Sequence, residues 1–207
     1  MVTISRNLKR LVYLISPNKI YPNFYVELNK VLASKKVSFF QLRLKKKPLN
    51  EVIKIAKRIR NITQKHNVKL IINDNSLIAK KVNADGCHLG QKDTPLHLIR
   101  NNIKKKIIGI TCHGSKRLAL DACKNKCDYI AFGSFFESKL KPKAKKADLK
   151  ILHWAKKNIK KPIIAIGGIT DKNYKKLIKS GANYIAISTF IWNNPLLKPE
   201  IAIKKFI

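Results

Sequence analysis

The sequence predicts an α/β fold, a single-domain (β/α)8 TIM barrel that spans residues 1–207. Two observations support this prediction: eight short apolar segments recur along the chain, and lysine-rich segments with helical spacing of their apolar residues lie between them. Several apolar segments are unbroken runs, which is typical of parallel strands buried on both faces. At 207 residues the chain is close to the lower limit of about 200 for such a barrel. An open, doubly wound sheet is the alternative.

The first expected strand, LVYLISP, follows basic residues and in that respect resembles a signal peptide. Its apolar part is too short for that role and no small-residue cleavage site follows, so a strand is favoured. The apolar region 49–66 between the second and third strands has helical spacing, whereas the segments around the fourth strand leave room only for short helices. The eight expected strands are, in order, 11–17, 37–45, 68–75, 86–90, 106–113, 129–136, 162–169 and 184–190.

The chain is strongly basic, with 45 Lys and Arg residues against 11 acidic ones and a net charge of +34. This balance permits contact with nucleic acid, an anionic membrane or phosphorylated metabolites. Only seven of the basic residues are Arg, the side chain that reads base edges and phosphates with two hydrogen bonds, and no nucleic-acid-binding signature is present. Lys, Ile and Asn have AT-rich codons, so codon bias is the favoured explanation and no specific nucleic-acid partner is expected.

The four cysteines predict reduced thiols and a cytoplasmic protein. They lie at positions 87, 112, 123 and 127, without a CxxC motif and without histidines at the spacing of metal ligands. No segment is long enough to cross a membrane, so no membrane association is expected. The sequence sets no oligomeric state, and a homo-oligomer is left open.

The carboxyl end of the second strand carries the first candidate site residues. Gln41, Arg43 and Lys45 alternate with Leu42 and Leu44, so period two places the three polar side chains on one face and the leucines on the other. In a barrel the leucines would meet the helices and the polar set would point to the mouth, where active sites lie. Two cations held there require an anion, because burying Arg43 without a partner is costly.

Acidic residues follow the third and fourth strands. Asn73 and Asp74 end the third strand, and Asp93 follows the fourth. Two carboxylates near cations suggest a Mg²⁺ site shared with a diphosphate, since Mg²⁺ usually takes one or two carboxylates, water and phosphate oxygens. The alternative for Asp93 is a cap of the following helix. Asp85 is interpreted as a turn residue and His88 as a packed barrel histidine.

The later strand ends supply hydroxyls and glycines. Thr111 ends the fifth strand and is either a ligand contact or a buried, satisfied hydroxyl. Gly167 and Gly168 after the seventh strand let the backbone approach a ligand closely, and Ser188 after the eighth could begin a short helix. These two loops are the usual phosphate site of the barrel fold. His113 has no acid in the sequence to orient it as a base.

Taken in order, the segments QLRLK, INDN…ADGCHLGQKD, GITCH, DYIAFGSFFES…K, PIIAIGGI and GANYIAIST resemble the thiamine-phosphate synthase family over nearly the whole chain. The resemblance implies a barrel that joins hydroxymethylpyrimidine diphosphate to a thiazole phosphate and releases diphosphate. It implies Mg²⁺ on Asp74 and Asp93. It also implies that the pyrimidine diphosphate is held by Gln41, Arg43, Lys45, Asn73, Thr111 and Lys141, and that the thiazole phosphate lies near Ser138, Gly168, Ile187 and Ser188.

The resemblance extends to the mechanism: Arg43, Lys45 and Lys141 would neutralise the departing diphosphate, the aminopyrimidine would stabilise the resulting cation, and no protein nucleophile is required. One departure from the family stands in the loop after the sixth strand. The family pattern T-x-T-K is here Ser138-Lys139-Leu140-Lys141, so one hydroxyl contact to the thiazole phosphate is replaced by Leu140. Two alternatives follow: a thiazole tautomerase-like or non-catalytic barrel that binds phosphorylated thiamine precursors, and a basic nucleic-acid-binding protein. The tautomerase usually has a histidine in this loop, where the chain has Ser134, so the synthase is favoured.

Overall fold

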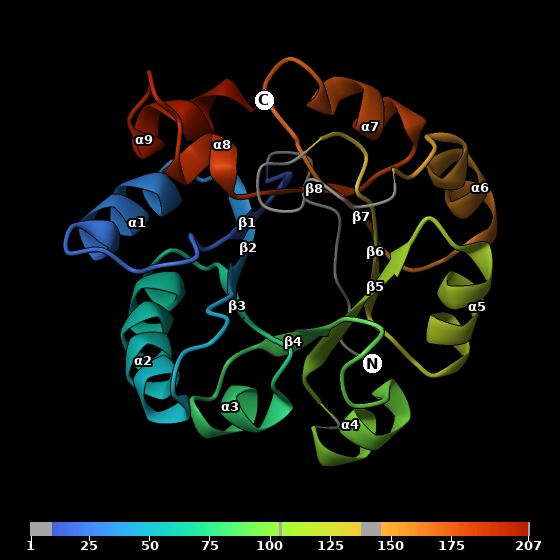
Figure 1. Ribbon diagram of the computed structural model, residues 1–207, viewed down its shortest axis with the longest axis horizontal. Helices are drawn as coiled ribbons and strands as arrows, with labels where there is room; N and C mark the ends of the chain where they lie inside the picture. Colours follow the sequence, from blue (N-terminus) through green and yellow to red (C-terminus); the bar gives the residue numbers. More distant parts are fainter. Residues whose placement is uncertain (1–9, 104, 138–145, 207) are drawn as a thin grey trace.

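A computed structural model describes residues 10–103, 105–137 and 146–206 of the chain. Eight parallel strands close into a barrel in the order of the sequence, each paired with its neighbours along the chain and β8 paired with β1. Figure 1 shows the ring of strands at the centre with the helices around it. The predicted (β/α)8 barrel is therefore confirmed, and the open doubly wound sheet is excluded.

All eight expected strands are present, and each is shorter than its expected range, in most cases at the carboxyl end. The described strands are β1 (Val12–Ile15), β2 (Val37–Leu42), β3 (Lys69–Asn73), β4 (Gly86–Leu89), β5 (Ile107–His113), β6 (Tyr129–Phe132), β7 (Ile163–Ile166) and β8 (Tyr184–Ile187). The residues expected to bind ligands thus lie at the last strand positions or in the loops just beyond them.

The helices follow the lysine-rich segments. The expected long helix is α2 (Leu49–Lys65), and the segments around β4 form the short α3 (Ser76–Lys81) and α4 (Leu96–Asn102), as predicted. The remaining elements are α1 (Phe24–Ala33), α5 (Lys116–Lys124), α6 (Lys150–Asn158), α7 (Tyr174–Ser180), α8 (Thr189–Trp192), α9 (Pro199–Ala202) and the 3-10 turn η1 (Ile203–Lys205). Among the described residues, no helix combines the length and the apolar composition needed to span a membrane.

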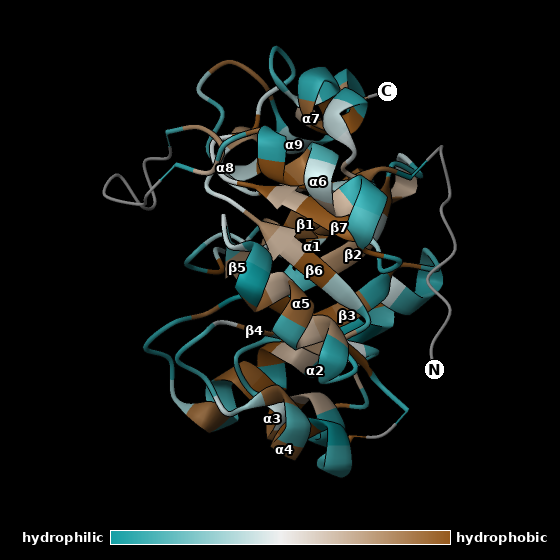
Figure 2. Cartoon of the chain, turned by 90° about the vertical axis from the view of Figure 1, so that its right-hand side faces the viewer, coloured by the Kyte–Doolittle hydropathy of each residue, from teal (hydrophilic) through white to brown (hydrophobic). Residues whose placement is uncertain are grey.

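Two apolar layers hold the barrel together. The larger layer lies between the strands and the helices, and the smaller one fills the barrel interior. Figure 2 shows brown, hydrophobic strands inside and mostly teal turns at the surface. The interior is a packed core and not a pore, as expected for this fold; it consists of Tyr13, Ile15, Phe39, Ile71, Ile107, Tyr129, Ala131, Ile164, Tyr184 and Ala186, with Ile166 packed against it.

A repeated contact closes the amino-terminal end of the barrel. Asp128, just before β6, accepts hydrogen bonds from the backbone N–H of Ile108 at 2.8 Å and from Arg100 Nη2 at 2.5 Å. Asp85, just before β4, makes the same pair of contacts two strands earlier, with the N–H of Leu70 and with Arg60. Each carboxylate therefore fixes the start of a neighbouring strand and neutralises a half-buried guanidinium.

Replacing Asp128 by alanine is expected to destabilise the protein by about 3 kcal/mol, because it removes the buried carboxylate that accepts hydrogen bonds from both Arg100 and the N–H of Ile108. The side chain of Asp128 is 3% exposed and that of Arg100 is 17% exposed. Urea denaturation followed by circular dichroism measures the change. Asp121→Ala on the exposed face of α5 is the control, with a change within about 0.5 kcal/mol. Equal effects at the two positions would contradict a structural role for the Asp128 pair.

Candidate active site

The candidate residues gather at the carboxyl ends of the strands. Because all eight strands are parallel and the barrel is closed, these ends form a single rim. Residues from β2, β3, β5 and β8, and from the loops after β4 and β7, therefore face a common region, although they are far apart in sequence.

The end of β2 follows the predicted alternation. Gln41 is 3% exposed, and Phe39, two residues earlier on the same face of the strand, belongs to the barrel interior. Leu42 and Leu44 instead pack in the layer beneath the helices. The backbone N–H of Arg43 donates to Ser16 Oγ at 2.9 Å, which ties the strand end to the neighbouring β1 loop. The Arg43 guanidinium donates to Asn18 Oδ1 at 3.4 Å, a long contact at an exposed position. The predicted division of faces is confirmed for Gln41 and for the two leucines, and the orientation of Arg43 and Lys45 toward a ligand stays a prediction.

Asp74 and Asp93 lie side by side on the rim. Burial raises the pKa of Asp74, and a hydrogen bond with Asp93 and the Asp93 charge raise this pKa further, while the charges of Lys45 and Arg43 oppose the rise. The end of β3 and the loop after β4 therefore bring two carboxyl groups together, and the end of β2 places two cations near them. The like-charged pair is the feature that calls for a proton or a metal ion between its members.

The backbone around the two carboxylates is fixed locally. Asp74 has a φ of 62°, and its N–H donates to the carbonyl of His88 at 2.8 Å. Asp93 Oδ2 accepts from the N–H of Gly90 at 2.6 Å. The alternative of a helix cap at Asp93 is not borne out, because Pro95 occupies the N-cap position of α4 and the Asp93 carboxylate bonds backward to Gly90.

Beneath the rim, polar side chains cross the barrel interior. His88 Nε2 lies 2.8 Å from Thr111 Oγ1 and His88 Nδ1 lies 2.9 Å from the Tyr129 hydroxyl, so His88 is a buried barrel histidine as predicted. Tyr129 in turn lies 2.8 Å from the hydroxyl of Tyr13. The Thr111 hydroxyl is thus hydrogen-bonded within the protein, and it forms the end of this series that lies nearest the rim. Sequence reasoning did not find the two tyrosines. Their positions in the alternation of β1 and β6 place them in the barrel interior, which was the available signal.

The loop after β7 runs against the loop after β6. A Cβ on Gly167, at φ 108°, would lie 2.0 Å from Ser134 Oγ, and one on Gly168, at φ 60°, would lie 2.1 Å from the carbonyl oxygen of Glu137. Both positions therefore require glycine for space and for backbone conformation. Ser138, Leu140 and Lys141, which follow directly in the chain, lie outside the described residues.

The end of β8 completes the rim. Ile187 is buried, and Ser188 Oγ donates to the carbonyl of Ser16 at 3.1 Å. Ser188 immediately precedes α8, which is the short helix that the sequence predicted there. Trp192 in α8 donates from Nε1 to the carbonyl of Ile15 at 2.7 Å and so fixes the helix against β1.

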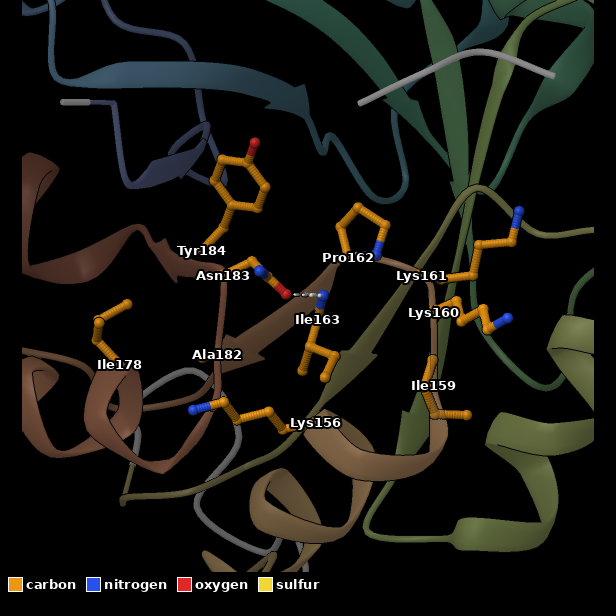
Figure 3. A pocket seen from close by; sticks show the side chains of 11 residues that line it. Lys156, Ile159, Lys160, Lys161, Pro162, Ile163, Ile178, Ala182, Asn183 and Tyr184 are labelled. Atoms are coloured by element: carbon orange, nitrogen blue, oxygen red, sulfur yellow. Dashed lines mark hydrogen bonds between the residues drawn. The ribbon is translucent and has the colours of Figure 1, made fainter. Parts of the chain in front are cut away.

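A separate cavity of about 330 Å³ lies at the opposite, amino-terminal end of β7 and β8. Figure 3 shows Asn183 Oδ1 accepting a hydrogen bond from the backbone of Ile163 at the centre of this region. Lys156, Lys160 and Lys161 line it without a carboxylate. None of the predicted site residues that the structure describes lines it, so this cavity is not the candidate active site.

Comparison with known proteins identifies the family. A family model described as thiamine monophosphate synthase matches residues 12–191. The chain belongs to this family. It is 55% identical to the thiamine-phosphate synthase of Pelagibacter ubique (strain HTCC1062), covering 95% of this chain and 96% of that protein. It is 37% identical to the thiamine-phosphate synthase of Erythrobacter litoralis (strain HTCC2594), covering 88% of each chain.

The solved structures agree with the thiamine monophosphate synthase family. The thiamine phosphate pyrophosphorylase from Pyrococcus furiosus superimposes with a TM-score of 0.86 at 27% identity, covering 97% of this chain and 96% of that chain. An orotidine 5'-phosphate decarboxylase from Pyrococcus horikoshii matches with a TM-score of 0.67 at 17% identity, which reflects the shared barrel alone. The family therefore rests on the sequence matches and the first of these structures.

Proposed function

We propose that the protein is a thiamine-phosphate synthase, a transferase of thiamine biosynthesis. It would condense 4-amino-2-methyl-5-hydroxymethylpyrimidine diphosphate with 4-methyl-5-(2-phosphooxyethyl)thiazole to give thiamine phosphate and diphosphate. The observation that carries the proposal is the meeting of Arg43 and Lys45 with the Asp74–Asp93 pair on the rim of a barrel of this family. The four cysteines are free thiols, in keeping with a cytoplasmic location.

The cofactor of this proposal is Mg²⁺, held by Asp74 and Asp93. Within the described part of the chain, no cluster of three or more His, Cys, Asp or Glu side chains could hold a metal ion. Two adjacent carboxylates fit an ion that keeps water and phosphate oxygens as its other ligands, which is the usual coordination of Mg²⁺. When bound, the metal would lower the charge that develops on the leaving diphosphate.

The cations of the rim would bind the same diphosphate. Arg43 offers a planar pair of donors and Lys45 a point charge, both close enough to Asp74 to affect its pKa. Their charges favour the transition state over the ground state, because negative charge on the diphosphate grows as its C–O bond breaks. Lys141 would add a third cation from the loop after β6. The residues that would hold the pyrimidine diphosphate are Gln41, Arg43, Lys45, Asn73, Thr111 and Lys141.

The second substrate would bind on the β7–β8 side. Gly168 lies where the backbone comes close to the β6 loop, and Ser188 begins α8. Ser138, Gly168, Ile187 and Ser188 would surround the thiazole phosphate, and positioning its ring nitrogen against the pyrimidine methylene would supply much of the rate. Leu140 in place of the family threonine removes one hydroxyl from this set.

The decisive experiment incubates the purified protein with both precursors and Mg²⁺ and follows thiamine phosphate by fluorescence after oxidation. Formation of thiamine phosphate and diphosphate in equal amounts is expected. A protein that binds the precursors without joining them would instead be a non-catalytic or tautomerase-like barrel. Sequence-selective retention of nucleic acid at physiological salt would favour the nucleic-acid alternative, whereas retention that merely falls with salt follows from the +34 charge.

Replacing Gly168 by alanine tests the thiazole phosphate side. The added Cβ must move the Glu137 carbonyl, so we expect the Michaelis constant for the thiazole phosphate to rise about 10- to 100-fold, the equivalent of one lost charge-assisted hydrogen bond. The constant for the pyrimidine diphosphate should stay nearly unchanged. Gly114→Ala is the control, because a Cβ there would make only ordinary contacts of 3.5 Å with Ala147. Equal changes for both substrates in Gly168→Ala would contradict this assignment.

A further inference from the structure

A series of hydrogen-bonded side chains connects opposite sides of the barrel beneath the rim. It runs from Thr111 through His88 and Tyr129 to Tyr13, with heavy-atom distances of 2.8, 2.9 and 2.8 Å. The two tyrosines and His88 are all less than 10% exposed. Gln41 lies at the far end: burial raises the pKa of Tyr13, while hydrogen bonds from Tyr129 and Gln41 lower it. The two ends, Thr111 and Gln41, are both residues proposed to contact the pyrimidine.

The barrel is built around this series. Gly109 in β5 pairs with Tyr129 in β6, and a Cβ on Gly109 would lie 1.8 Å from Tyr129 Cζ. The Tyr129 ring therefore lies over β5 because Gly109 has no side chain. This lets Tyr129 reach His88 on β4, where the two rings stack with centroids 5.6 Å apart and an interplanar angle of 16°. The contact between His88 and Tyr129 thus depends on a specific glycine as well as on the two ring residues.

Hydrogen bonding imposes one sense on the whole series, that is, a single direction in which each group donates to the next. A neutral imidazole donates from one nitrogen and accepts at the other, and each hydroxyl has a single proton to donate. If His88 donates from Nε2 to Thr111, then its Nδ1 accepts from Tyr129, Tyr129 accepts from Tyr13, and Tyr13 accepts from the Gln41 amide. The Thr111 proton and the Gln41 carbonyl oxygen are then both available to a ligand. The opposite sense turns Thr111 into an acceptor and Gln41 into a donor.

We infer that His88 is a positioning residue that sets this sense and thereby selects an aminopyrimidine. The inference rests on the proposed function. Thr111 donates to a ring nitrogen of the substrate, and Gln41 Oε1 accepts from its exocyclic amino group. A 4-oxo analogue of the pyrimidine diphosphate presents a carbonyl oxygen and a ring N–H instead, so the pattern of donors and acceptors is reversed. A site with fixed donors and acceptors rejects such an analogue because its buried polar groups are left unpaired.

Two substitutions of His88 separate positioning from packing. His88→Gln places an amide near the position of Nε2 and keeps the Thr111 contact, whereas His88→Asn places it near Nδ1 and keeps the Tyr129 contact. Each variant loses one buried hydrogen bond, so similar losses of thermal stability are expected. Only His88→Asn should weaken binding of the 4-amino pyrimidine diphosphate, by about 3- to 10-fold for one neutral hydrogen bond. His88→Gln should bind within about threefold of the wild type.

The measurement is calorimetric titration of the 4-amino and 4-oxo pyrimidine diphosphates with Mg²⁺ and without the thiazole, so that no turnover is needed. The ratio of the two dissociation constants should fall in His88→Asn. It should also fall in Tyr129→Phe, which keeps the ring and removes only the hydroxyl, and in His88→Gln, because both variants lose the His88–Tyr129 contact that fixes the direction of the series. On a Thr111→Val background, His88→Asn should have no further effect, because the contact that it removes is already lost.

The inference is overturned if His88→Asn and His88→Gln bind alike, if the ratio stays at the wild-type value in Tyr129→Phe, or if the effects of His88→Asn and Thr111→Val add. These outcomes are distinct from failure of the proposed function. A wild-type protein that binds the pyrimidine diphosphate but makes no thiamine phosphate refutes the synthase activity and leaves the binding comparison valid. A wild-type protein that does not bind the pyrimidine diphosphate refutes both.

Discussion

Arg43→Ala should reduce kcat/KM by at least about 100-fold and leave the fold intact. Each charge-assisted hydrogen bond to the diphosphate contributes about 1.5–3 kcal/mol, and the guanidinium can make two of them. The loss should appear in kcat as well as in KM, because the charge on the diphosphate increases in the transition state. The Arg43 side chain makes one long hydrogen bond, to Asn18, so little stability depends on it. Steady-state kinetics with each substrate varied in turn measures the effect.

Lys46→Ala is the matched control. Lys46 is exposed and has the opposite parity from Arg43 and Lys45, and its φ of 63° places it in the turn beyond β2. Its removal lowers the net charge by the same amount, so any general effect of charge on substrate attraction is shared by both variants. We expect its kcat/KM to stay within about twofold of the wild type. Equal losses in the two variants would show that the β2 end acts only as diffuse positive charge.

The barrel was predictable because its strands are unambiguous in the sequence. Runs such as residues 11–15 contain apolar side chains at successive positions, which is typical of a strand buried on both faces, and the helical spacing of 49–66 does not fit a strand. The strand ends were less predictable. Polar residues continue the alternation beyond the last ladder contact, so Arg43 and Lys45 were placed in a strand that ends at Leu42.

The site was predictable where a strand end carries a rare residue type. The chain has 11 acidic residues, so Asp74 and Asp93 at neighbouring strand ends stood out, and in the structure Asp93 is close enough to raise the pKa of Asp74; their role as metal ligands stays a prediction. The tyrosines behind His88 were not predicted, because an interior aromatic residue with a polar tip has the same pattern as an ordinary core residue. The hydrogen bond between Tyr13 and Tyr129 joins positions 116 residues apart, and no local pattern encodes such a pairing.

Four of the 11 acidic residues fall into two pairs with different roles in this barrel. Asp85 and Asp128 at the amino-terminal end each neutralise an arginine and fix a strand, so their charges are compensated within the protein. Asp74 and Asp93 at the carboxyl end contact each other, so their charges are compensated only in part by Lys45 and Arg43. The first arrangement stabilises the fold, whereas the second is costly to the fold, as expected if the pair is the proposed metal site.

Asp74→Asn should therefore have opposite effects on activity and on stability. Loss of a metal-binding carboxylate removes several kcal/mol of charge stabilisation, so kcat/KM at limiting Mg²⁺ should fall about 100- to 1000-fold. Stability of the metal-free protein should rise, because the pKa of Asp74 is raised in the fold by burial and by Asp93. A carboxyl group of this kind contributes stability below its unfolded-state pKa of about 3.8 and loses it as the pH rises through the folded value.

The two effects are measured by kinetics and by thermal melting in chelator and in Mg²⁺ between pH 4 and pH 8. In chelator, the melting temperature of Asp74→Asn relative to the wild type should increase with pH, since only the wild type must ionise the crowded carboxyl. Added Mg²⁺ should stabilise the wild type more than the variant, because binding to the folded state raises its stability by mass action. Asp121→Asn makes the same change of charge on an exposed helix face and should change neither property. A wild type and an Asp74→Asn variant that respond equally to Mg²⁺ would remove Asp74 from the metal site, even if activity is lost.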